Sequence, residues 1–337
     1  MGMLKNNIVV IILITFTLAC VFLTSCDSVD DLAKSEEQTS TVTLHIDTRA
    51  VGSGSTAANE GIKTLRVIAA ITSTRTVVGN VFYQEGFTGS IAEVNEIVFS
   101  DIPYGNVTFY AIANEASLGL DLQAVSEGSV LQENEWENKI VMAEQYFPLL
   151  RRDIGINGLP ITGIKTVFIN QASQTIEIPI TRVVAKIELN FTNNAPFEIP
   201  IYSLVLGEFM PDRTYLFSYD DGGKLPIPSG VAYQNHVFLR TSGGSGVTIQ
   251  QGENKELLVF YVLESQRTDI EPTPYTLGIE TVASGVLMNP KPFMQQRFIK
   301  RNTRIVVDIT IDDRGGNKIE WEVKDWSDVA VDVPSFS

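Results

Sequence analysis

Apolar and polar residues alternate with a period of two in many short stretches of this chain, and Gly, Pro, Asn and Asp residues separate these stretches. Such alternation is typical of β-strands with one buried face, because successive side chains of a strand point to opposite sides. Long stretches with the 3.6-residue period of a helix are missing, and residues 133–145 fit a short helix or a strand equally well. The predicted strands cover residues 41–47, 62–71, 97–99, 107–113, 167–170, 176–180, 183–191, 201–206, 257–263, 275–279, 304–311, 318–323 and 329–333, with Phe298 in one more.

This pattern predicts an all-β fold with two β-sandwich domains in series, of a transthyretin-like or Greek-key-like kind. Two local expectations follow from it. Residues 167–170 and 176–180 are expected to pair as strands around a polar turn. In the alternating stretch 183–191, Lys186 and Glu188 are expected to be exposed between apolar neighbours.

The N-terminus has the pattern of a bacterial lipoprotein signal. Lys5 supplies positive charge before an apolar run over residues 8–23, which is short for crossing a bilayer, since that takes about 20 helical residues. The sequence Leu-Thr-Ser then precedes Cys26, so an aliphatic and two small residues stand before the cysteine whose thiol accepts the lipid. We therefore expect export from the cytoplasm and a lipidated Cys26, followed by a flexible polar tether.

Composition and charge exclude several classes of site. Cys26 is expected to carry the lipid and Cys20 lies in the apolar run, so no cysteine remains for a disulfide framework, thiol catalysis or a cysteine metal site. The formal net charge of −15 argues against nucleic acid and against anionic membrane surfaces as partners. The abundance of Val, Ile, Thr, Phe and Tyr fits the half-buried strands already predicted.

Motifs that carry enzymatic chemistry are absent from the sequence. It has no nucleophile elbow, P-loop, His-Glu-x-x-His or dinucleotide fingerprint. The only histidines, His45 and His236, are too few for a His-rich metal site. Residues 220–223 and 312–316 are rich in Asp and Gly, and we interpret them as hairpin turns rather than calcium loops. We therefore expect no catalytic residue, no metal and no cofactor.

An arginine follows the first predicted strand, in which Val42, Leu44 and Ile46 share one face. Arg49 and Ala50 stand between this strand and a Gly/Ser-rich connection, a junction that suits a trypsin-like or Arg-specific protease. Cleavage there would remove lipid, tether and strand together, and the open groove could recruit a strand from another subunit. The alternative is a surface arginine beside a permanent first strand.

With the cut, the predicted parts are a lipoprotein signal (1–26), a tether with the removable first strand (27–49), an N-terminal β-sandwich (50–180) and a C-terminal β-sandwich (181–337).

Several short segments follow Arg49 in a recognisable order. They are Phe-Ser-Asp-Ile-Pro-Tyr-Gly-Asn (99–106), Tyr-Ala-Ile-Ala-Asn-Glu (110–115), Leu-Pro-Ile-Thr-Gly (159–163), Ile-Thr-Arg-Val-Val-Ala-Lys-Ile (180–187), Phe-Tyr-Val-Leu-Glu-Ser (260–265) and Ile-Lys-Arg-Asn-Thr-Arg-Ile-Val-Val (299–307). In this order they resemble the Pro-x-Gly turn and "ANE" strand, the "PMTG" segment, and the "L-x-R-x-V-A-K", "FY-x-x-E" and "RN-x-x-Y" strands of the type V pilins, the fimbrillin-like lipoproteins of Bacteroidales. Ile161 stands where the family usually has methionine, and Ile305 where it usually has an aromatic residue.

The resemblance implies a lipidated precursor at the outer membrane. An Arg-specific protease would remove everything through Arg49, and the subunit would join other pilin subunits by strand exchange in a cell-surface fimbrium with a role in adhesion. Shaft subunits of the family also offer a C-terminal donor strand. Here Val329, Val331 and Val333 alternate and could serve, although Pro334 interrupts the stretch, so the alternative is the last strand of its own domain. The choice between shaft and accessory or tip subunit stays open, with a lean to the latter, and the host or bacterial surface receptor is unknown.

A second hypothesis is a permanently lipidated surface β-sandwich that binds a glycan or another ligand. It requires an exposed aromatic platform. Tyr215, Phe217 and Tyr219 have the i, i+2, i+4 spacing of one strand face, although such a face more often belongs to a core. The missing motifs argue against a third hypothesis, a secreted hydrolase.

Overall fold

The computed structural model describes residues 38–47, 60–84, 96–132, 136, 140–142, 149–150, 157–217, 225–238, 247–270, 272–281, 287–311 and 317–325. Residues Ser40–Ser337 form one compact unit. In the part of the chain that the structure describes, no helix is long and apolar enough to cross a membrane.

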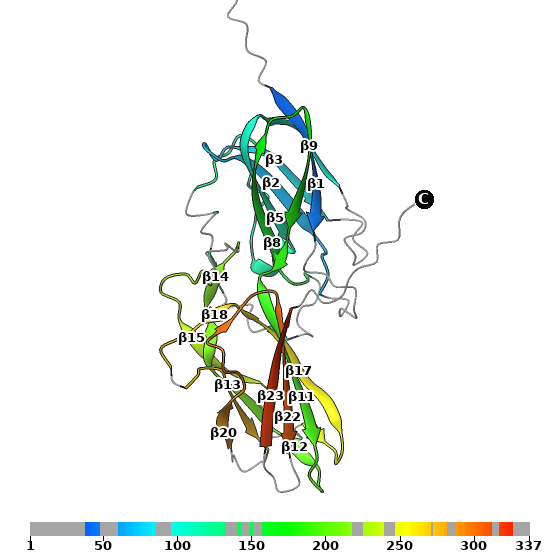
Figure 1. The fold of residues 1–337 in the computed structure, drawn as a ribbon, viewed down its shortest axis with the longest axis vertical. Coiled ribbons are helices and arrows are strands. Elements are labelled where there is room, and N and C mark those ends of the chain that lie inside the picture. The colour runs from blue at the N-terminus through cyan, green and yellow to red at the C-terminus, as the bar shows by residue number, and fades with distance from the viewer. Residues whose placement is uncertain are drawn as a thin grey trace, which may run out of the picture. The chain divides into compact units, whose positions relative to one another are not determined.

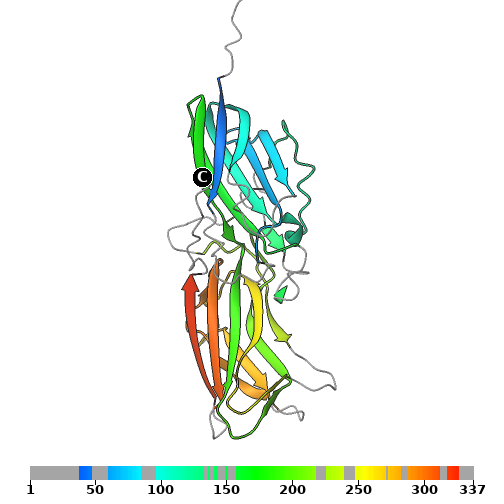
Figure 2. The same ribbon diagram turned by 90° about the vertical axis from the view of Figure 1, so that its right-hand side faces the viewer.

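The N-terminal strands form two sheets (Figures 1 and 2). The smaller sheet has the order β4 (Ile97–Pro103), β1 (Thr39–Asp47), β9 (Ser173–Pro179). The larger has the order β10 (Thr181–Arg182), β8 (Ile161–Ile169), β5 (Gly105–Ala113), β2 (Leu65–Ile71), β3 (Val77–Tyr83). A short 3₁₀ turn, η2 (Glu115–Leu118), follows β5.

The strands between residues 184 and 325, joined by the short β7 (Leu149–Leu150) from earlier in the chain, also form two main sheets. One has the order β23 (Asn317–Asp325), β22 (Thr303–Ile311), β11 (Val184–Asn193), β17 (Asn254–Leu263), β7 (Leu149–Leu150). The other has the order β15 (Tyr233–Phe238), β13 (Ser203–Pro211), β19 (Thr276–Glu280), β20 (Leu287–Pro292). Three small pairs join β12 (Ile199–Ile201) to β16 (Val247–Ile249), β14 (Arg213–Tyr215) to β6 (Ile140–Met142), and β18 (Ser265–Gln266) to β21 (Phe298–Ile299).

Apolar faces of facing sheets pack together in both halves of the chain. One core joins Val42 and Leu44 of the small N-terminal sheet to Val67 and Phe109 of the larger one. A second core is made by C-terminal strands between residues 185 and 311. The predicted all-β, sandwich-like fold is thus confirmed. The division into domains at residue 181 stays a prediction, because residues 40–337 belong to one compact unit.

Strand β2 is buried on both faces, which explains its nearly continuous apolar sequence. Val67 and Ala69 point into the core that contains β1. Ile68 and Ala70 point into a further cluster with Tyr110 and other side chains. The predicted strand 62–71 therefore exists, but it begins three residues later, at Leu65.

Two local expectations were wrong. Strands β8 and β9 are neighbours in the chain, but β8 pairs with β5 and β10 whereas β9 pairs with β1, so they do not form a hairpin. Lys186 and Glu188 are buried, with 7% and 5% exposure, rather than exposed. Their charges are satisfied by ionic partners, as described below, and this is what makes their burial tolerable.

Candidate functional site around the first strand

Strand β1 is the central strand of the small N-terminal sheet, with β4 on one side and β9 on the other. Figure 2 shows β1 in dark blue beside the green β9. The two strands run parallel, in a register that extends from Thr41 opposite Ser173 to Asp47 opposite Pro179. The Thr41 N–H also donates to the Ala172 carbonyl at 2.9 Å. Removing β1 would therefore expose backbone edges on two strands at once.

The side chains of β1 alternate between core and surface. Val42 and Leu44 are completely buried, whereas Thr41 is exposed. Ile46 is partly buried and packs against the same core. The apolar face lies where the sequence pattern put it, while the removal of this strand stays a prediction.

The burial of β1 stabilises the sheet substantially. Each apolar side chain of this size contributes roughly 1.5–3 kcal/mol when it is buried. Each ladder hydrogen bond adds about 1 kcal/mol net. A subunit without β1 would have an apolar groove between β4 and β9 together with unpaired backbone groups, a surface that favours the binding of another strand.

We expect Leu44→Ala to lower the free energy of unfolding of the uncut chain by about 2–5 kcal/mol, because the truncated side chain leaves a cavity in a fully buried site. Urea unfolding followed by circular dichroism measures this. Thr41→Ala is the matched control on the exposed face of the same strand. Equal stability of the two variants would contradict the central role of β1 in this core.

Several predicted site residues lie outside the described residues. These are Cys26, Arg49, Ala50 and the proposed donor residues Val329, Val331 and Val333. Tyr219 of the proposed aromatic platform lies outside them as well.

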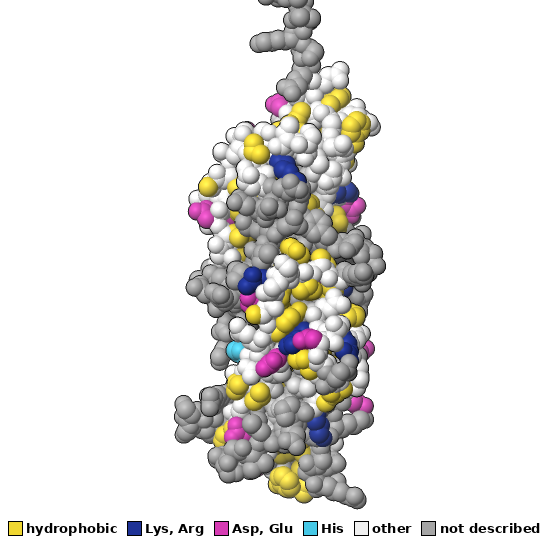
Figure 3. All heavy atoms as spheres, turned by 90° about the vertical axis from the view of Figure 1, so that its left-hand side faces the viewer, with side chains coloured by type: hydrophobic (Ala, Val, Ile, Leu, Met, Phe, Trp, Pro, Cys, Tyr) yellow, Lys and Arg dark blue, Asp and Glu magenta, His cyan; other side chains and the backbone are white. Residues whose placement is uncertain are grey.

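The aromatic platform of the second hypothesis is not formed as predicted. Strand β14 ends at Tyr215, so Phe217 does not continue the same strand face. Phe217 is completely buried, and its ring centroid lies 5.4 Å from that of Tyr110. On the face shown in Figure 3, the hydrophobic side chains of the described residues are scattered among polar and charged ones. Among the residues that the structure describes, the exposed large hydrophobic ones are Val98, Val130, Phe168, Phe197, Val237 and Phe298.

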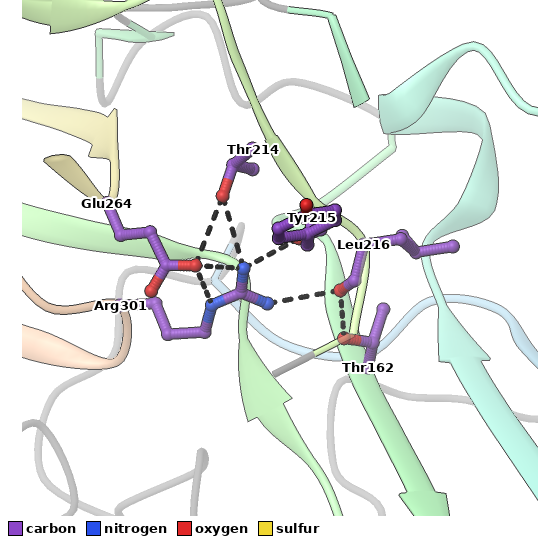
Figure 4. Close-up of polar contacts among 6 residues, drawn as sticks. All are labelled: Thr162, Thr214, Tyr215, Leu216, Glu264 and Arg301. Carbon is purple, nitrogen blue, oxygen red and sulfur yellow. Dashed lines mark hydrogen bonds and ion pairs between the residues drawn. The ribbon is translucent and has the colours of Figure 1, made fainter. Parts of the chain in front are cut away.

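A buried ion pair joins two of the sequence segments that carry the family resemblance (Figure 4). Arg301 Nε donates to Glu264 Oε1 at 2.9 Å, and a terminal nitrogen of the guanidinium contacts the same oxygen. Both side chains are almost completely buried, with 2% and 1% exposure. In the sequence, Arg301 and Glu264 were noted only as parts of the family-like segments, and their ion pair was not predicted. The available signal was their position beside strongly apolar strands.

The same guanidinium also binds backbone carbonyls. Arg301 donates to the Tyr215 carbonyl at 2.6 Å and to the Leu216 carbonyl at 3.1 Å. Thr162 of β8 donates its hydroxyl to the same Leu216 carbonyl at 2.7 Å (Figure 4). The cluster therefore fixes the chain after β14, which carries Leu216 and Phe217 into the apolar cluster around Tyr110.

The Asn-Glu pair at the end of β5 has a comparable role. Glu115 accepts two bonds from Arg66 of β2, at 2.6 and 2.8 Å. Asn114 has a positive φ of 58°, a conformation that Asn tolerates better than most residues. This pair links the start of η2 to β2 of the larger sheet.

A third charged cluster explains the burial of Lys186 and Glu188. Lys186 Nζ lies 3.0 Å from both Glu60 and Glu188, and Arg304 lies 2.7 Å from Glu188. Burial would raise the pKa of Glu188, but hydrogen bonds from Arg304 and Lys186 outweigh it and lower the pKa. Burial lowers the pKa of the neighbouring Arg182 to about 10, although Glu60 opposes the shift. No group of His, Cys, Asp and Glu residues that could hold a metal occurs within the described ranges.

Comparison with known proteins shows which solved structures share this fold. No protein-family model matches the chain, and no curated protein matches it in sequence. A fimbrilin from Porphyromonas gingivalis superposes with a TM-score of 0.56 at 15% identity, over 87% of this chain and 99% of that one. The chain shares its fold with solved proteins of this kind. A proposed cell adhesion protein from Parabacteroides distasonis has a TM-score of 0.53 at 16% identity, over 86% of this chain and 97% of that one. Another, from Bacteroides eggerthii, has a TM-score of 0.51 at 14% identity, over 86% and 96%.

Proposed function

We propose that this chain is a structural subunit of a fimbria, in a shaft or an accessory or tip position, with a role in adhesion. It is assembled by strand exchange after proteolysis at Arg49 removes the N-terminal strand. The observation that carries the proposal is the place of β1, an N-terminal strand that lies in the centre of its sheet with Val42 and Leu44 completely buried. Loss of a strand in this place opens a groove that another strand can fill.

The sequence and the fold both support this order of lipidation, cleavage and assembly. The leader favours a precursor lipidated at Cys26 and carried to the outer membrane, and Arg49 follows β1 directly enough for one cut to release lipid, tether and strand. The fold is shared with a solved fimbrilin. In this proposal an Arg-specific protease makes the cut. The mature subunit then consists of β-sandwich domains at 50–180 and 181–337, and its partners are other fimbrial subunits.

The proposal is tested on protein sheared from the cell surface. We expect the mature chain to begin at Ala50, because the cut after Arg49 precedes assembly. N-terminal sequencing and intact mass of fimbriae enriched by shearing measure this. If every mature copy carries lipid on Cys26, the chain is a permanently anchored lipoprotein and the proposal is wrong.

A further inference from the structure

The segment just downstream of the proposed cut is fastened to the rest of the fold by a buried carboxylate. Glu60 has no exposed surface. Its Oε1 accepts a hydrogen bond from the Tyr261 hydroxyl at 2.6 Å and lies 3.0 Å from Lys186 Nζ. Lys186 and Tyr261 face each other on the paired strands β11 and β17. Glu60 is therefore held at a fixed position against β11 and β17 of the C-terminal sheet.

The next residues are fastened by the side chain of Asn114. Its Oδ1 accepts from the backbone N–H groups of Lys63 and Thr64, at 2.8 and 3.2 Å. Its Nδ2 donates to the carbonyls of Gly61 and Leu159, at 3.0 and 2.6 Å. The backbone N–H of Asn114 donates to the Thr64 carbonyl at 3.0 Å. One buried amide thus satisfies backbone groups along the whole approach to β2.

Gly158 allows this close approach. It has a φ of +71°, and a Cβ at this position would lie 2.6 Å from Asn114 Nδ2 and 2.9 Å from the Gly61 carbonyl oxygen. Only glycine fits this conformation without moving the segment. The hydrogen bonds that Asn114 makes to this segment therefore depend on the absence of a side chain at Gly158.

The hydrogen bonds of Glu60 and Asn114 hold the part of the chain that contains the next basic residues after Arg49. Residues 50–59 contain no Lys or Arg, so Lys63 and Arg66 are the next sites for a protease that cuts after basic residues. Such enzymes bind extended backbone that is free of its own structure. The backbone at Lys63 is held by Asn114, and the Arg66 guanidinium is held by Glu115 and by Asn80, at 3.0 Å.

We infer that Glu60 and Asn114 form a latch that marks the start of the mature fold, so that proteolysis after Arg49 releases β1 and stops there. The inference rests on the proposed function for its biological role. Every residue of the latch lies downstream of Arg49 and stays with the mature subunit. The latch therefore persists when β1 leaves, and it keeps β2 in place beside the opened groove.

The test uses the full precursor, purified in detergent and digested with trypsin, with N-terminal peptides followed by mass spectrometry. Wild type is expected to give a product that begins at Ala50. Glu60→Gln is expected to raise the rate of cleavage after Lys63 about tenfold or more, because proteolysis follows the population of the locally open state. Tyr261→Phe keeps the ring and removes only the hydroxyl bond to Glu60, so it is expected to show a smaller increase in the same direction. Glu127→Gln, at an exposed loop position, is the matched control and is expected to behave as wild type.

Hydrogen exchange of residues 61–66 separates this inference from the proposed function. The latch predicts equal protection of these amides before and after the cut in wild type, and weaker protection in uncut Glu60→Gln. Loss of protection in the cut wild type, or cleavage and exchange in both variants identical to wild type, would overturn the inference. If surface protein turns out to be uncut at Arg49, the fimbrial proposal fails, yet exchange in the uncut chain still reports on the latch.

Discussion

Arg49→Ala precursor is expected to accumulate at the membrane and to leave fimbriae without this subunit. The uncut chain keeps β1 between β4 and β9, with Val42 and Leu44 in the core, so no groove opens for another strand. An incoming strand would have to displace β1 from that position, at a cost of roughly 1.5–3 kcal/mol for each buried apolar side chain and about 1 kcal/mol for each ladder hydrogen bond. Immunoelectron microscopy and fractionation of cells that carry the variant measure the loss.

Arg49→Lys is the matched control for this experiment. It keeps the positive charge, so a trypsin-like protease still processes it, but it lacks the guanidinium, so an Arg-specific protease leaves it uncut. The variant therefore identifies the class of protease. Assembly of Arg49→Ala into fimbriae at the wild-type level, with β1 still attached, would sink the strand-exchange account.

The second large effect is expected at the buried ion pair of Arg301 and Glu264. Arg301→Leu is expected to lower the free energy of unfolding by about 3–5 kcal/mol, because it leaves the Glu264 charge buried without its cation. The Tyr215 and Leu216 carbonyls lose the hydrogen bonds from Arg301 as well, although Leu216 keeps the one from the Thr162 hydroxyl. Urea unfolding of the purified chain, followed by tryptophan fluorescence, measures the change.

An exposed ion pair and a double variant are the controls for this prediction. Lys255→Met breaks a surface pair with Glu253 and is expected to change the free energy of unfolding by about 0–1 kcal/mol. Adding Glu264→Leu to Arg301→Leu is expected to restore part of the loss, since the unpaired buried charge is gone. If Arg301→Leu costs no more than Lys255→Met, the cluster does not fix the chain after β14.

The sequence pattern predicted strands and their apolar faces well where a single strand supplied the information. In β1, alternation alone placed Val42 and Leu44 on the face that is buried. In β22, predicted over 304–311 and observed over Thr303–Ile311, the same rule applied. Both predictions depend only on the period of the strand, which is a property of neighbouring residues.

The pattern failed where distant residues decide the outcome. A polar turn between β8 and β9 suggested a hairpin, but β9 pairs with β1, which lies far earlier in the chain. Phe217 has the spacing of a strand face shared with Tyr215, but β14 ends before it and the ring packs on Tyr110. Neither partner is visible in the local sequence.

The sequence by itself determined that this protein is built from short strands, which residues of the first strand are apolar, and where Cys26 and Arg49 stand relative to that strand. Only the tertiary structure decided that β1 is the central strand of its sheet and that Lys186 and Glu188 are buried. The physical reason is the same in both cases. Strand periodicity is local, whereas pairing and the burial of charge depend on partners such as β9 and Glu60 that folding brings in from distant parts of the chain.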